Sequence, residues 1–445
     1  MIGRLSPSQI LVFGFALTIL IGAALLTLPF SSASGNHTPF IDALFMATSA
    51  VCVTGLIVVN TATHFSIFGQ IIILALIQIG GLGFMTLATM MIFLVGRRVS
   101  IKEKLIQSEA TGAFSFGDMV HFTVYILKIT LLVEAMGAIL LALRWCKEFG
   151  LVNGVFKAVF HSVSAFCNAG FSVFPSNLIN YVLDPIVNLT ITSLVIIGGI
   201  GYIVLKDVYL LKKFRKFSLH TKIVLITSIA LLTAGTLVIF LLEKSNYATM
   251  GALTFKQKIM ASYFHAVTPR TAGFNTVDIS SLRYSTMFFV MFLMFIGASP
   301  GSTGGGIKTT TFAVLIASIF RTLKGKQEVN IFNRRIPGET MRKAFVIPIL
   351  AFSWVSLITF ILLYTENAQP IRLVFEVISA FSTVGLSAAQ GTHLSLSSLF
   401  SSFGKLLISL TMFIGRVGPL TIGLAMIYKD QKEAFKYAEE QVTVG

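Results

Sequence analysis

The chain has 445 residues, of which 55% are hydrophobic and only 12% are charged, and its mean hydropathy is +0.85. A water-soluble globular protein needs many more charged residues to cover its surface, so this composition excludes that class and indicates an integral membrane protein. The formal net charge is +16, but the basic residues collect in connecting segments, so we interpret the charge as a signal of membrane topology and expect no nucleic-acid partner.

Long apolar stretches recur along the whole chain, with clear examples at residues 10–30, 68–95, 219–242 and 344–364. A helix needs about 20 residues to cross a hydrocarbon core of roughly 30 Å, and each stretch is long enough. The first stretch is followed by further spans instead of a small-residue cleavage site. We therefore expect an uncleaved transmembrane helix there and not a signal peptide.

Basic residues gather in the segments 97–104, 206–222 and 321–343, and a tail of mixed charge covers 429–440. The positive-inside rule places these segments and both chain termini in the cytoplasm. Alternatively, these basic segments form a surface that binds an acidic lipid or a cytoplasmic partner. The three cysteines and seven histidines show neither a disulfide framework nor metal-ligand spacing, so we expect no redox or organic cofactor in this chain.

A short segment occurs four times at similar intervals. Each copy begins with a phenylalanine and ends nine or ten residues later at a glycine, and successive glycines are 115, 103 and 112 residues apart. The phenylalanines are Phe45, Phe160, Phe264 and Phe375, and the glycines are Gly55, Gly170, Gly273 and Gly385. A second signature rich in isoleucine and glycine follows each copy, beginning at Ile79, Ile197, Ile296 and Ile414. Two signatures in the same order, four times, indicate an internal fourfold repeat.

We therefore predict an all-α membrane protein of four helix–pore loop–helix repeats around a central pore, with eight transmembrane helices and four re-entrant half-helices. The repeats cover residues 1–104, 105–217, 218–335 and 336–445. In each repeat a long helix precedes a segment of about 10–14 residues, too short to span, and a second long helix follows. Irregular backbone at membrane depth has to be buried in protein or line a water-filled cavity, so the four loops should converge on one axis. Because the basic segments fall between repeats, the loops lie on the extracellular side.

The four loops are candidates for coordinating a cation with backbone carbonyl oxygens. No carboxylate lies in the first three loops, and Glu376 in the fourth stands near the start of its half-helix, where it complements the helix dipole. Glycine permits positive-φ conformations that aim successive carbonyls at one axis. Close helix packing is the alternative role for such glycines, and we keep it for the second signature in repeats 1 and 2. The candidate ion-binding residues are Val53, Thr54, Gly55, Asn168, Ala169, Gly170, Thr271, Ala272, Gly273, Thr383, Val384 and Gly385.

The loops Val53–Leu56 and Thr383–Leu386 look like degenerate potassium-channel filters. Four unequal copies in one chain resemble the superfamily of Trk, Ktr and plant HKT potassium transporters, and the length and loop sequences are most similar to the bacterial Ktr membrane subunits. The resemblance covers nearly the whole chain. It implies potassium uptake across the plasma membrane of a bacterium, a homodimer in the bilayer, and a cytoplasmic ring of nucleotide-binding regulatory subunits of the RCK type. Sodium-preferring members often have serine at the first filter glycine, so Gly55 favours K⁺ as the bound ion, while Na⁺ as a coupling or activating ion stays open.

The third loop departs most from this pattern, because Arg270 stands three residues before Gly273. An unpaired cation there would oppose ion entry, so we expect its guanidinium to be turned away from the axis and paired.

The second helix of repeat 3 is interrupted by a segment with a proline and five glycines within ten residues, which cannot sustain a helix in lipid. Broken helices at membrane depth mark transport sites, and the resemblance implies an intramembrane loop that obstructs the pore below the filter. A packing kink is the alternative. A nucleotide-binding P-loop is excluded because the lysine is one residue out of register and no strand precedes it. The candidate gate residues in this segment are Gly297, Ala298, Ser299, Pro300, Gly301, Ser302, Thr303, Gly304, Gly305, Gly306 and Lys308.

Arg416 is the second candidate for a gate. It lies within the apolar run 403–428, where a charged residue costs about 2.5–3.5 kcal/mol on insertion scales. The resemblance places a positive residue here under the filter and beside the repeat 3 loop, where it would repel cations and latch the loop. A purely structural salt bridge is the alternative.

Two other classes of function compete with a passive, gated potassium pathway. A sodium- or proton-coupled secondary transporter usually shows two inverted repeats, and four repeats in the same direction disfavour it. An intramembrane enzyme would need a catalytic pair within its spans, and we identify none in the sequence.

Overall fold

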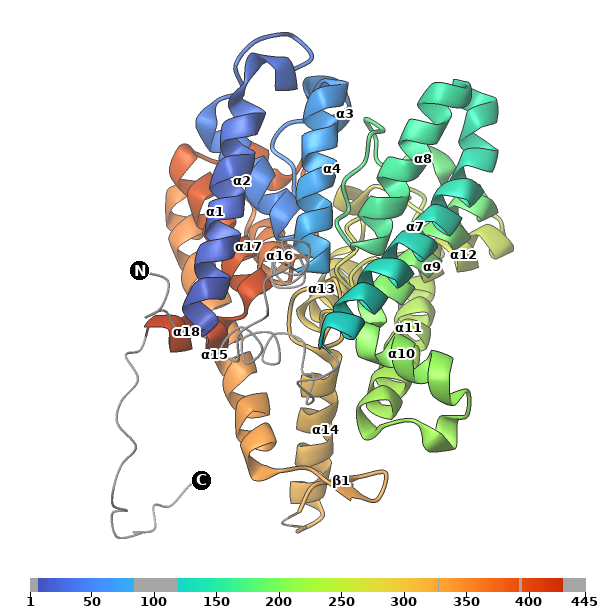
Figure 1. Ribbon diagram of the computed structural model, residues 1–445, viewed down its shortest axis with the longest axis vertical. Coiled ribbons are helices and arrows are strands. Elements are labelled where there is room, and N and C mark those ends of the chain that lie inside the picture. Colours follow the sequence, from blue (N-terminus) through green and yellow to red (C-terminus); the bar gives the residue numbers. More distant parts are fainter. Residues whose placement is uncertain (1–6, 84–118, 327, 392–393, 427–445) are drawn as a thin grey trace.

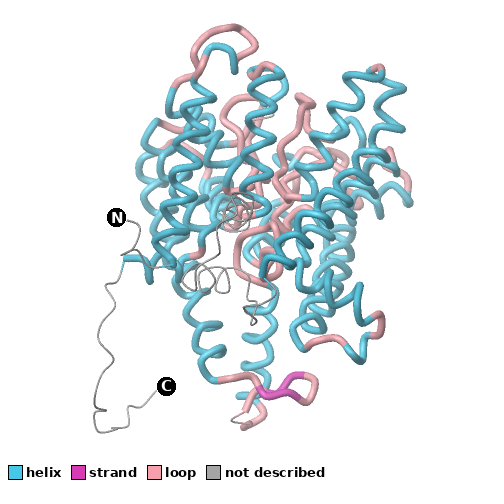
Figure 2. The backbone as a smooth tube through the Cα atoms, viewed as in Figure 1, coloured by secondary structure: helices cyan, strands magenta, loops and turns pink. Residues whose placement is uncertain are grey.

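The structure is a computed structural model that describes residues 7–83, 119–326, 328–391 and 394–426 (Figure 1). Helices make up nearly all of its regular structure (Figure 2). One small antiparallel hairpin pairs Asn330 with Arg335 and Ile331 with Arg334. The prediction of an all-α membrane fold is confirmed. The basic segments predicted at 97–104 and 429–440 lie outside the described residues.

Each predicted repeat range contains a long first helix, a shorter helix before the glycine loop and at least one further helix after it. Range 1–104 has α1 (Pro7–Thr27), η2 (Pro29–Ser31), α2 (Phe40–Val51), α3 (Thr61–His64) and α4 (Ile67–Leu82). Range 105–217 has α7 (Met119–Phe149), α8 (Leu151–Phe166), η3 (Ile179–Tyr181), α9 (Pro185–Ile200), α10 (Tyr202–Leu211) and η4 (Phe214–Lys216). Range 218–335 has α11 (Leu219–Glu243), α12 (Phe255–Val267), η5 (Ile279–Ser281), α13 (Tyr284–Phe295), α14 (Thr309–Leu323), β1 (Asn330–Ile331) and β2 (Arg334–Arg335). Range 336–445 has α15 (Gly338–Thr365), α16 (Pro370–Phe381), η6 (Leu396–Leu399), α17 (Ser402–Val417) and α18 (Pro419–Met426).

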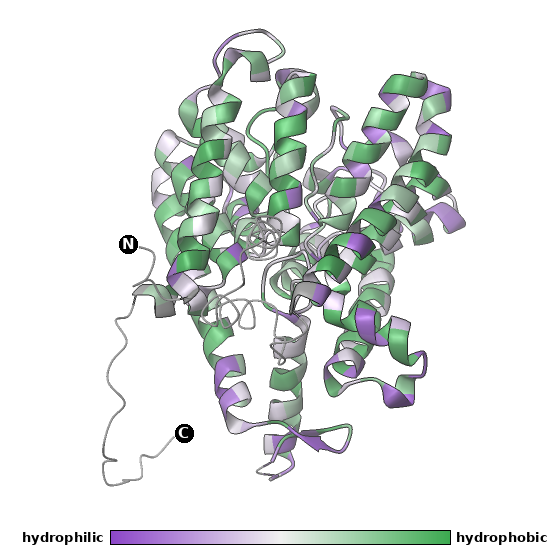
Figure 3. Ribbon diagram, in the orientation of Figure 1, coloured by the Kyte–Doolittle hydropathy of each residue, from purple (hydrophilic) through white to green (hydrophobic). Residues whose placement is uncertain are grey.

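Four described helices are long and apolar enough to cross a membrane, and each is the first helix of its range. They cover Ser8–Thr27, His121–Phe149, Leu219–Glu243 and Gly338–Thr365. Their outward faces are apolar, with Leu17, Leu131 and Phe352 each 60–67% exposed, as expected for side chains that contact lipid. Figure 3 shows apolar residues along these helices, and polar residues around the β1–β2 hairpin and the connection from α10 to α11.

The half-helices α2, α8, α12 and α16 have 12 to 16 residues. At 1.5 Å per residue they are too short to cross the bilayer. Each packs against the first helix of its own range and leads directly into one of the four glycine loops. This arrangement brings the loops together inside the protein, where irregular backbone is tolerated.

The second helices differ from the expected continuous spans. α4, α9 and α17 end one residue before Gly83, Gly201 and Gly418, and these glycines have φ values of 80°, 94° and 95°. Such values favour glycine and terminate a helix. The chain bends by 96° between α9 and α10 at Gly201. In repeat 3 the break is longer, since α13 ends at Phe295 and α14 begins at Thr309.

The first glycine of the second signature has a packing role. A methyl group on Gly80, Gly198 or Gly415 would overlap the carbonyl oxygen of Val51, Phe166 or Phe381, respectively. These carbonyls belong to the last turns of the half-helices α2, α8 and α16. The glycines therefore let each second helix cross closely behind the end of its half-helix, as small residues do in membrane proteins. The packing interpretation applies to repeats 1, 2 and 4.

Candidate functional site

The four loops share one backbone conformation. In each loop the glycine has a positive φ, between 69° and 92°, and so does the residue two positions before it. Those preceding residues are Val53, Asn168, Thr271 and Thr383, with φ values of 57°, 61°, 67° and 50°. A left-handed conformation is uncommon outside glycine and is a marked outlier for a β-branched residue such as valine. Strain of this kind persists only where the surrounding structure enforces it, and it often marks a functional site.

The four glycines form a closed ring. A methyl group on Gly170 would lie 2.8 Å from the carbonyl oxygen of Ala272, and one on Gly273 would lie 2.6 Å from that of Val384. In the same way, a methyl group on Gly385 would overlap the carbonyl oxygen of Thr54, and one on Gly55 that of Ala169. Each repeat thus contacts the next in the order 1-2-3-4-1. The ring leaves no room for a side chain at any of the four positions.

The amide hydrogens and the carbonyl oxygens of the loops face different surroundings. The amides of Val53 and Thr54 donate to the carbonyls of Ala50 and Ser49, at 3.1 and 2.8 Å, and repeats 2 and 4 have the same pair of bonds. By contrast, the carbonyl oxygens of the twelve candidate ion-binding residues accept no hydrogen bond from any residue that the structure describes. A ring of buried carbonyls without donors is suited to replacing the hydration shell of a cation.

A hydroxyl group near the end of each half-helix is hydrogen-bonded to the loop that follows. Ser49 and Ser379 accept hydrogen bonds from the amides of Gly55 and Gly385, at 3.0 and 3.1 Å. In repeats 2 and 3, Ser164 and Thr268 donate to the carbonyls just after the glycine, at 2.8 and 2.5 Å. These hydroxyls were not among the predicted site residues, although the sequence has one five or six residues before each glycine.

In repeats 2, 3 and 4 the residue after the repeated phenylalanine is a second support for the loop. His161, His265 and Glu376 contact the hydroxyls of Ser172, Thr276 and Ser387, at 2.8, 3.4 and 2.5 Å. The expected role for Glu376 at the start of its half-helix was wrong. Glu376 lies in the second half of α16, fully buried, and it also accepts hydrogen bonds from the amide and hydroxyl of Ser397, at 3.0 and 2.5 Å. It fixes the chain that returns from the fourth loop.

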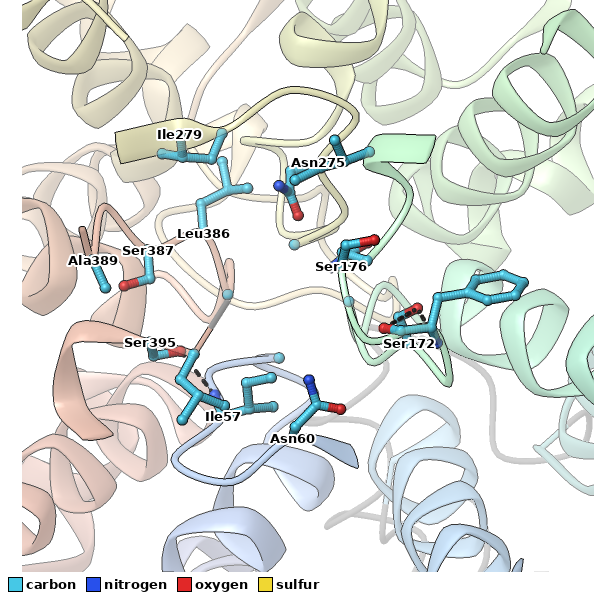
Figure 4. A pocket seen from close by; sticks show the side chains of 18 of the residues that line it. Ile57, Asn60, Ser172, Ser176, Asn275, Ile279, Leu386, Ser387, Ala389 and Ser395 are labelled. Carbon is cyan, nitrogen blue, oxygen red and sulfur yellow. Dashed lines mark hydrogen bonds between the residues drawn. The ribbon is translucent and has the colours of Figure 1, made fainter. Parts of the chain in front are cut away.

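A recess leads to the ring from one side. Gly55, Gly170, Gly273 and Gly385 line it together with side chains from all four repeats. Figure 4 shows the four chain segments around this recess, with Asn60, Ser172, Asn275 and Ser387 among the side chains on its walls. Among the residues that the structure describes, Asp278 is the only titratable one that lines it. The walls therefore offer mainly hydroxyl and amide groups to an approaching ion.

The predicted intramembrane loop, residues 297–308, lies on the other side of the ring. A short parallel bridge between Ile296 and Ile307 closes its base. A methyl group on Gly304 or Gly305 would overlap the hydroxyl oxygen of Thr271 or Thr383, which are candidate ion-binding residues of repeats 3 and 4. Two glycines of the loop therefore lie directly against the inner end of the ring.

Other residues of the loop are bound to repeat 2. The amides of Ser299 and Thr303 donate to the carbonyls of Gly199 and Gly198, at 3.0 and 3.3 Å. The amide of Tyr202 donates to the carbonyl of Gly301 at 2.9 Å, at the break between α9 and α10. The start of α10 is therefore the part of repeat 2 that lies next to Pro300, Gly301 and Ser302. The predicted gate residues therefore split into a part that packs against the glycine loops and a part that attaches the 297–308 segment to repeat 2.

Two half-buried cations bind carbonyl groups of the loop. The Arg416 guanidinium donates to the carbonyl of Thr303 in the loop and to that of Gly80 in α4. Lys308 Nζ donates to the carbonyl of Gly304 at 2.8 Å. Among the described residues neither cation has a carboxylate within ion-pair distance, so the arrangement does not match a structural salt bridge at Arg416.

Arg270 is turned toward α11. Its Nη2 donates to the hydroxyl of Ser228 at 3.0 Å, and the residue is 7% exposed. Its partner is therefore a neutral hydroxyl, and within the part of the chain that the structure covers no carboxylate pairs with it.

Comparisons with known proteins agree with this architecture. The family model TrkH, described as a cation transport protein, matches residues 7–437. The chain is 44% identical to the Ktr system potassium uptake protein B of Bacillus subtilis, over 99% of this chain and 97% of that protein. It is 37% identical to the potassium/sodium uptake protein NtpJ of Enterococcus hirae, over 99% of this chain and 98% of that protein. The crystal structure of the potassium transporter TrkH from Vibrio parahaemolyticus superposes with a TM-score of 0.76 at 18% identity, covering 96% of this chain and 86% of that one.

Proposed function

Since the chain belongs to the TrkH family of cation transport proteins, we propose that it is the ion-conducting membrane subunit of a potassium uptake system. The observation that carries the proposal is the closed ring of four glycine loops whose carbonyl oxygens have no hydrogen-bond donors. The names of relatives that match over nearly their whole length support potassium as the ion.

In this proposal K⁺ is the transported ion, and backbone carbonyls select it. The carbonyls of residues 53–55, 168–170, 271–273 and 383–385 replace its hydration shell at the ring. The half-helices point their partially negative C-termini at the same place, which favours a cation. The polar recess lined by Asn60 and Ser387 is the outer entrance.

The 297–308 loop and Arg416 control passage. The loop obstructs the path directly below the ring because Gly304 and Gly305 press against Thr271 and Thr383. Arg416 holds the loop to α4 and adds a positive charge under the filter. Movement of the loop away from the ring opens the path.

The assembly that we propose is a homodimer in the plasma membrane of a bacterium, regulated by a cytoplasmic nucleotide-binding ring of the RCK type. Both termini are cytoplasmic, with the basic segments 206–222 and 321–343 on the same side. Those segments lie toward the end of the molecule that carries the β1–β2 hairpin, while the half-helices α2 and α8 lie toward the opposite end (Figure 1).

A sodium-coupled mechanism is the second candidate, because one relative is named as a potassium/sodium uptake protein. The two candidates differ in what drives flux. A passive pathway follows the electrochemical gradient of K⁺ alone, whereas a coupled carrier moves K⁺ only when Na⁺ moves with it.

The test is uptake of K⁺ and Na⁺ in cells that lack their own potassium transporters, with and without a glycine-to-serine change at each of the four loop glycines. We expect K⁺ uptake that loses selectivity or collapses in the variants. Uptake of neither ion, with a regulatory subunit present, would contradict the proposal. K⁺ uptake that stops when external Na⁺ is removed would favour the coupled carrier.

A further inference from the structure

Asp278 lies at the polar recess outside the ring, and neither the proposed filter nor the proposed gate uses it. It is exposed, and it lines the recess together with the four loop glycines. It directly precedes η5, five residues after Gly273 of the third loop. Within the described part of the chain, the walls of the recess thus carry one carboxylate, and it comes from repeat 3.

The contacts of Asp278 hold its carboxylate in place without neutralising it. The amide of Ser280 donates to Oδ1 at 2.9 Å, and the hydroxyls of Ser280 and Ser281 donate to Oδ2 at 2.8 and 2.9 Å. All three donors are neutral, and no lysine, arginine or histidine that the structure describes is within ion-pair distance of this carboxylate. An exposed aspartate with such donors carries its negative charge at neutral pH. The charge therefore acts on the recess.

The other charged side chains near the glycine loops are buried behind the walls. Arg270 of the third loop is 7% exposed and bonds to a neutral hydroxyl. Arg372 at the start of α16 is 6% exposed and donates to the carbonyl of Ala388 at 2.7 Å. The acid Glu376 is fully buried, and its bonds go to two serine hydroxyls and an amide. Without Asp278, an ion that enters the recess would meet neutral wall groups with two arginines behind them.

We infer that the recess is a recruitment site for hydrated monovalent cations, in which the Asp278 carboxylate concentrates K⁺ before the ion enters the ring. The inference rests on the proposed potassium pathway. A cleft whose walls carry one sign of charge focuses its electric field and raises the local concentration of counter-ions. The attraction acts on an ion that keeps its water shell, so it treats K⁺ and Na⁺ alike. Recruitment in the recess is thus separate from selection in the ring.

The test is a charge series at position 278, with K⁺ uptake measured in cells that lack their own potassium transporters and the membrane level of each variant determined. At an ionic strength of about 0.01 M the Debye length is roughly 30 Å, so the charge acts across the recess. Asp278→Asn keeps the shape and removes the charge, so the KM for K⁺ should rise roughly two- to fivefold while the maximal rate stays unchanged. Asp278→Lys reverses the charge and should raise KM further. An impermeant salt at about 0.3 M should bring the three KM values together, because it screens the charge.

Three further variants are controls for shape, hydrogen bonding and position. Asp278→Glu keeps the charge and changes the shape, so its KM should stay close to the native value. Ser281→Ala removes a hydroxyl that bonds to the same carboxylate and leaves the charge in place. Glu148→Gln removes the charge of a half-exposed acid that does not line the recess. The last two should leave KM unchanged. Because recruitment does not select, the ratio of K⁺ to Na⁺ uptake in competition should keep its native value in Asp278→Asn.

A merely structural role of Asp278 gives the opposite order, because asparagine can still accept the Ser280 amide bond and the longer glutamate disturbs it. That order, or an unchanged KM in Asp278→Asn at low ionic strength, would overturn the inference. Should the uncharged and reversed variants fail to reach the membrane, the salt dependence of the native KM replaces them, and a KM that does not rise with ionic strength overturns the inference too. Absence of K⁺ uptake by the native protein is a different outcome, since it contradicts the proposed function itself.

Discussion

Gly304 of the intramembrane loop lies directly against the hydroxyl of Thr271, and a methyl group on this glycine would overlap the hydroxyl oxygen. Gly305 has the same relationship with Thr383 in the next repeat. Both threonines precede a filter glycine by two residues, and the Thr383 hydroxyl is buried without a described hydrogen-bond partner. The loop therefore packs closely against two of the four glycine loops through two positions that have no side chain.

This contact predicts the effect of adding a single carbon atom to the loop. Gly304→Ala or Gly305→Ala should push the loop away from the ring, because the filter threonines stand on strained backbone that leaves them little freedom to yield. We expect basal K⁺ flux without a regulatory partner to rise severalfold. The measurement is K⁺ uptake by cells that express the membrane subunit alone.

Gly423→Ala is the matched control for this change. Gly423 lies in α18, and nothing stands within 4 Å of a methyl group placed there. It should leave basal flux unchanged. Equal flux in all three variants and the native protein would show that the contact does not hold the path closed.

The first filter glycine gives a prediction about selectivity. Gly55→Ser places a side chain against the carbonyl oxygen of Ala169 at a φ of 92°, so it should distort the ring and weaken the discrimination of K⁺ over Na⁺. The ratio of K⁺ to Na⁺ uptake in competition measures this. Gly35→Ser is the control, since Gly35 also has a positive φ, 74°, but faces open space. An unchanged ratio in Gly55→Ser would contradict the filter assignment.

Much of this architecture could be predicted from the sequence because it repeats. Four copies of a phenylalanine followed nine or ten residues later by a glycine predicted four short helices and four loops, and the loops meet in one ring. The helix ends at Gly83, Gly201 and Gly418 could not be predicted from the sequence. A glycine can either end a helix or let two helices pack closely, and the second signature contains several glycines.

Contacts between repeats were harder to predict. Arg416 was identified from the cost of its charge, yet its acceptors, the carbonyls of Gly80 and Thr303, are backbone atoms more than 110 residues away in two other repeats. No side-chain pattern marks a carbonyl acceptor. The partners of Glu376 were missed for a related reason, since Ser387 and Ser397 are two of many serines in this part of the chain.

The hydroxyl behind the fourth loop gives a prediction about stability. Ser379→Ala leaves the partly buried amide of Gly385 without its acceptor, which costs about 1–3 kcal/mol. We expect a lower thermal unfolding temperature in detergent and a weaker K⁺ preference. Ser409→Ala is the control, because among the described residues the Ser409 hydroxyl bonds only to the carbonyl of Lys405 within its own helix. Equal unfolding temperatures for the two variants would show that the Ser379 bond does not stabilise the loop.

Arg416 gives the last prediction. Its guanidinium bonds simultaneously to the loop and to α4, and a planar group with several donors suits this better than any shorter side chain. Arg416→Gln removes both the latch and the positive charge below the filter, so basal K⁺ flux should rise. Arg416→Lys keeps the charge, but one ammonium group holds two separate carbonyls less well, so its flux should be intermediate.

Lys405→Met is the control for these changes. It removes a cation from the outer end of the same helix and breaks the ion pair with Asp42, and it should leave basal flux at the native level. The lysine variant separates the effect of the charge from that of the two hydrogen bonds. If Arg416→Lys has a flux as low as that of the native protein, repulsion by the charge alone closes the path. If its flux is as high as that of Arg416→Gln, the two hydrogen bonds close it.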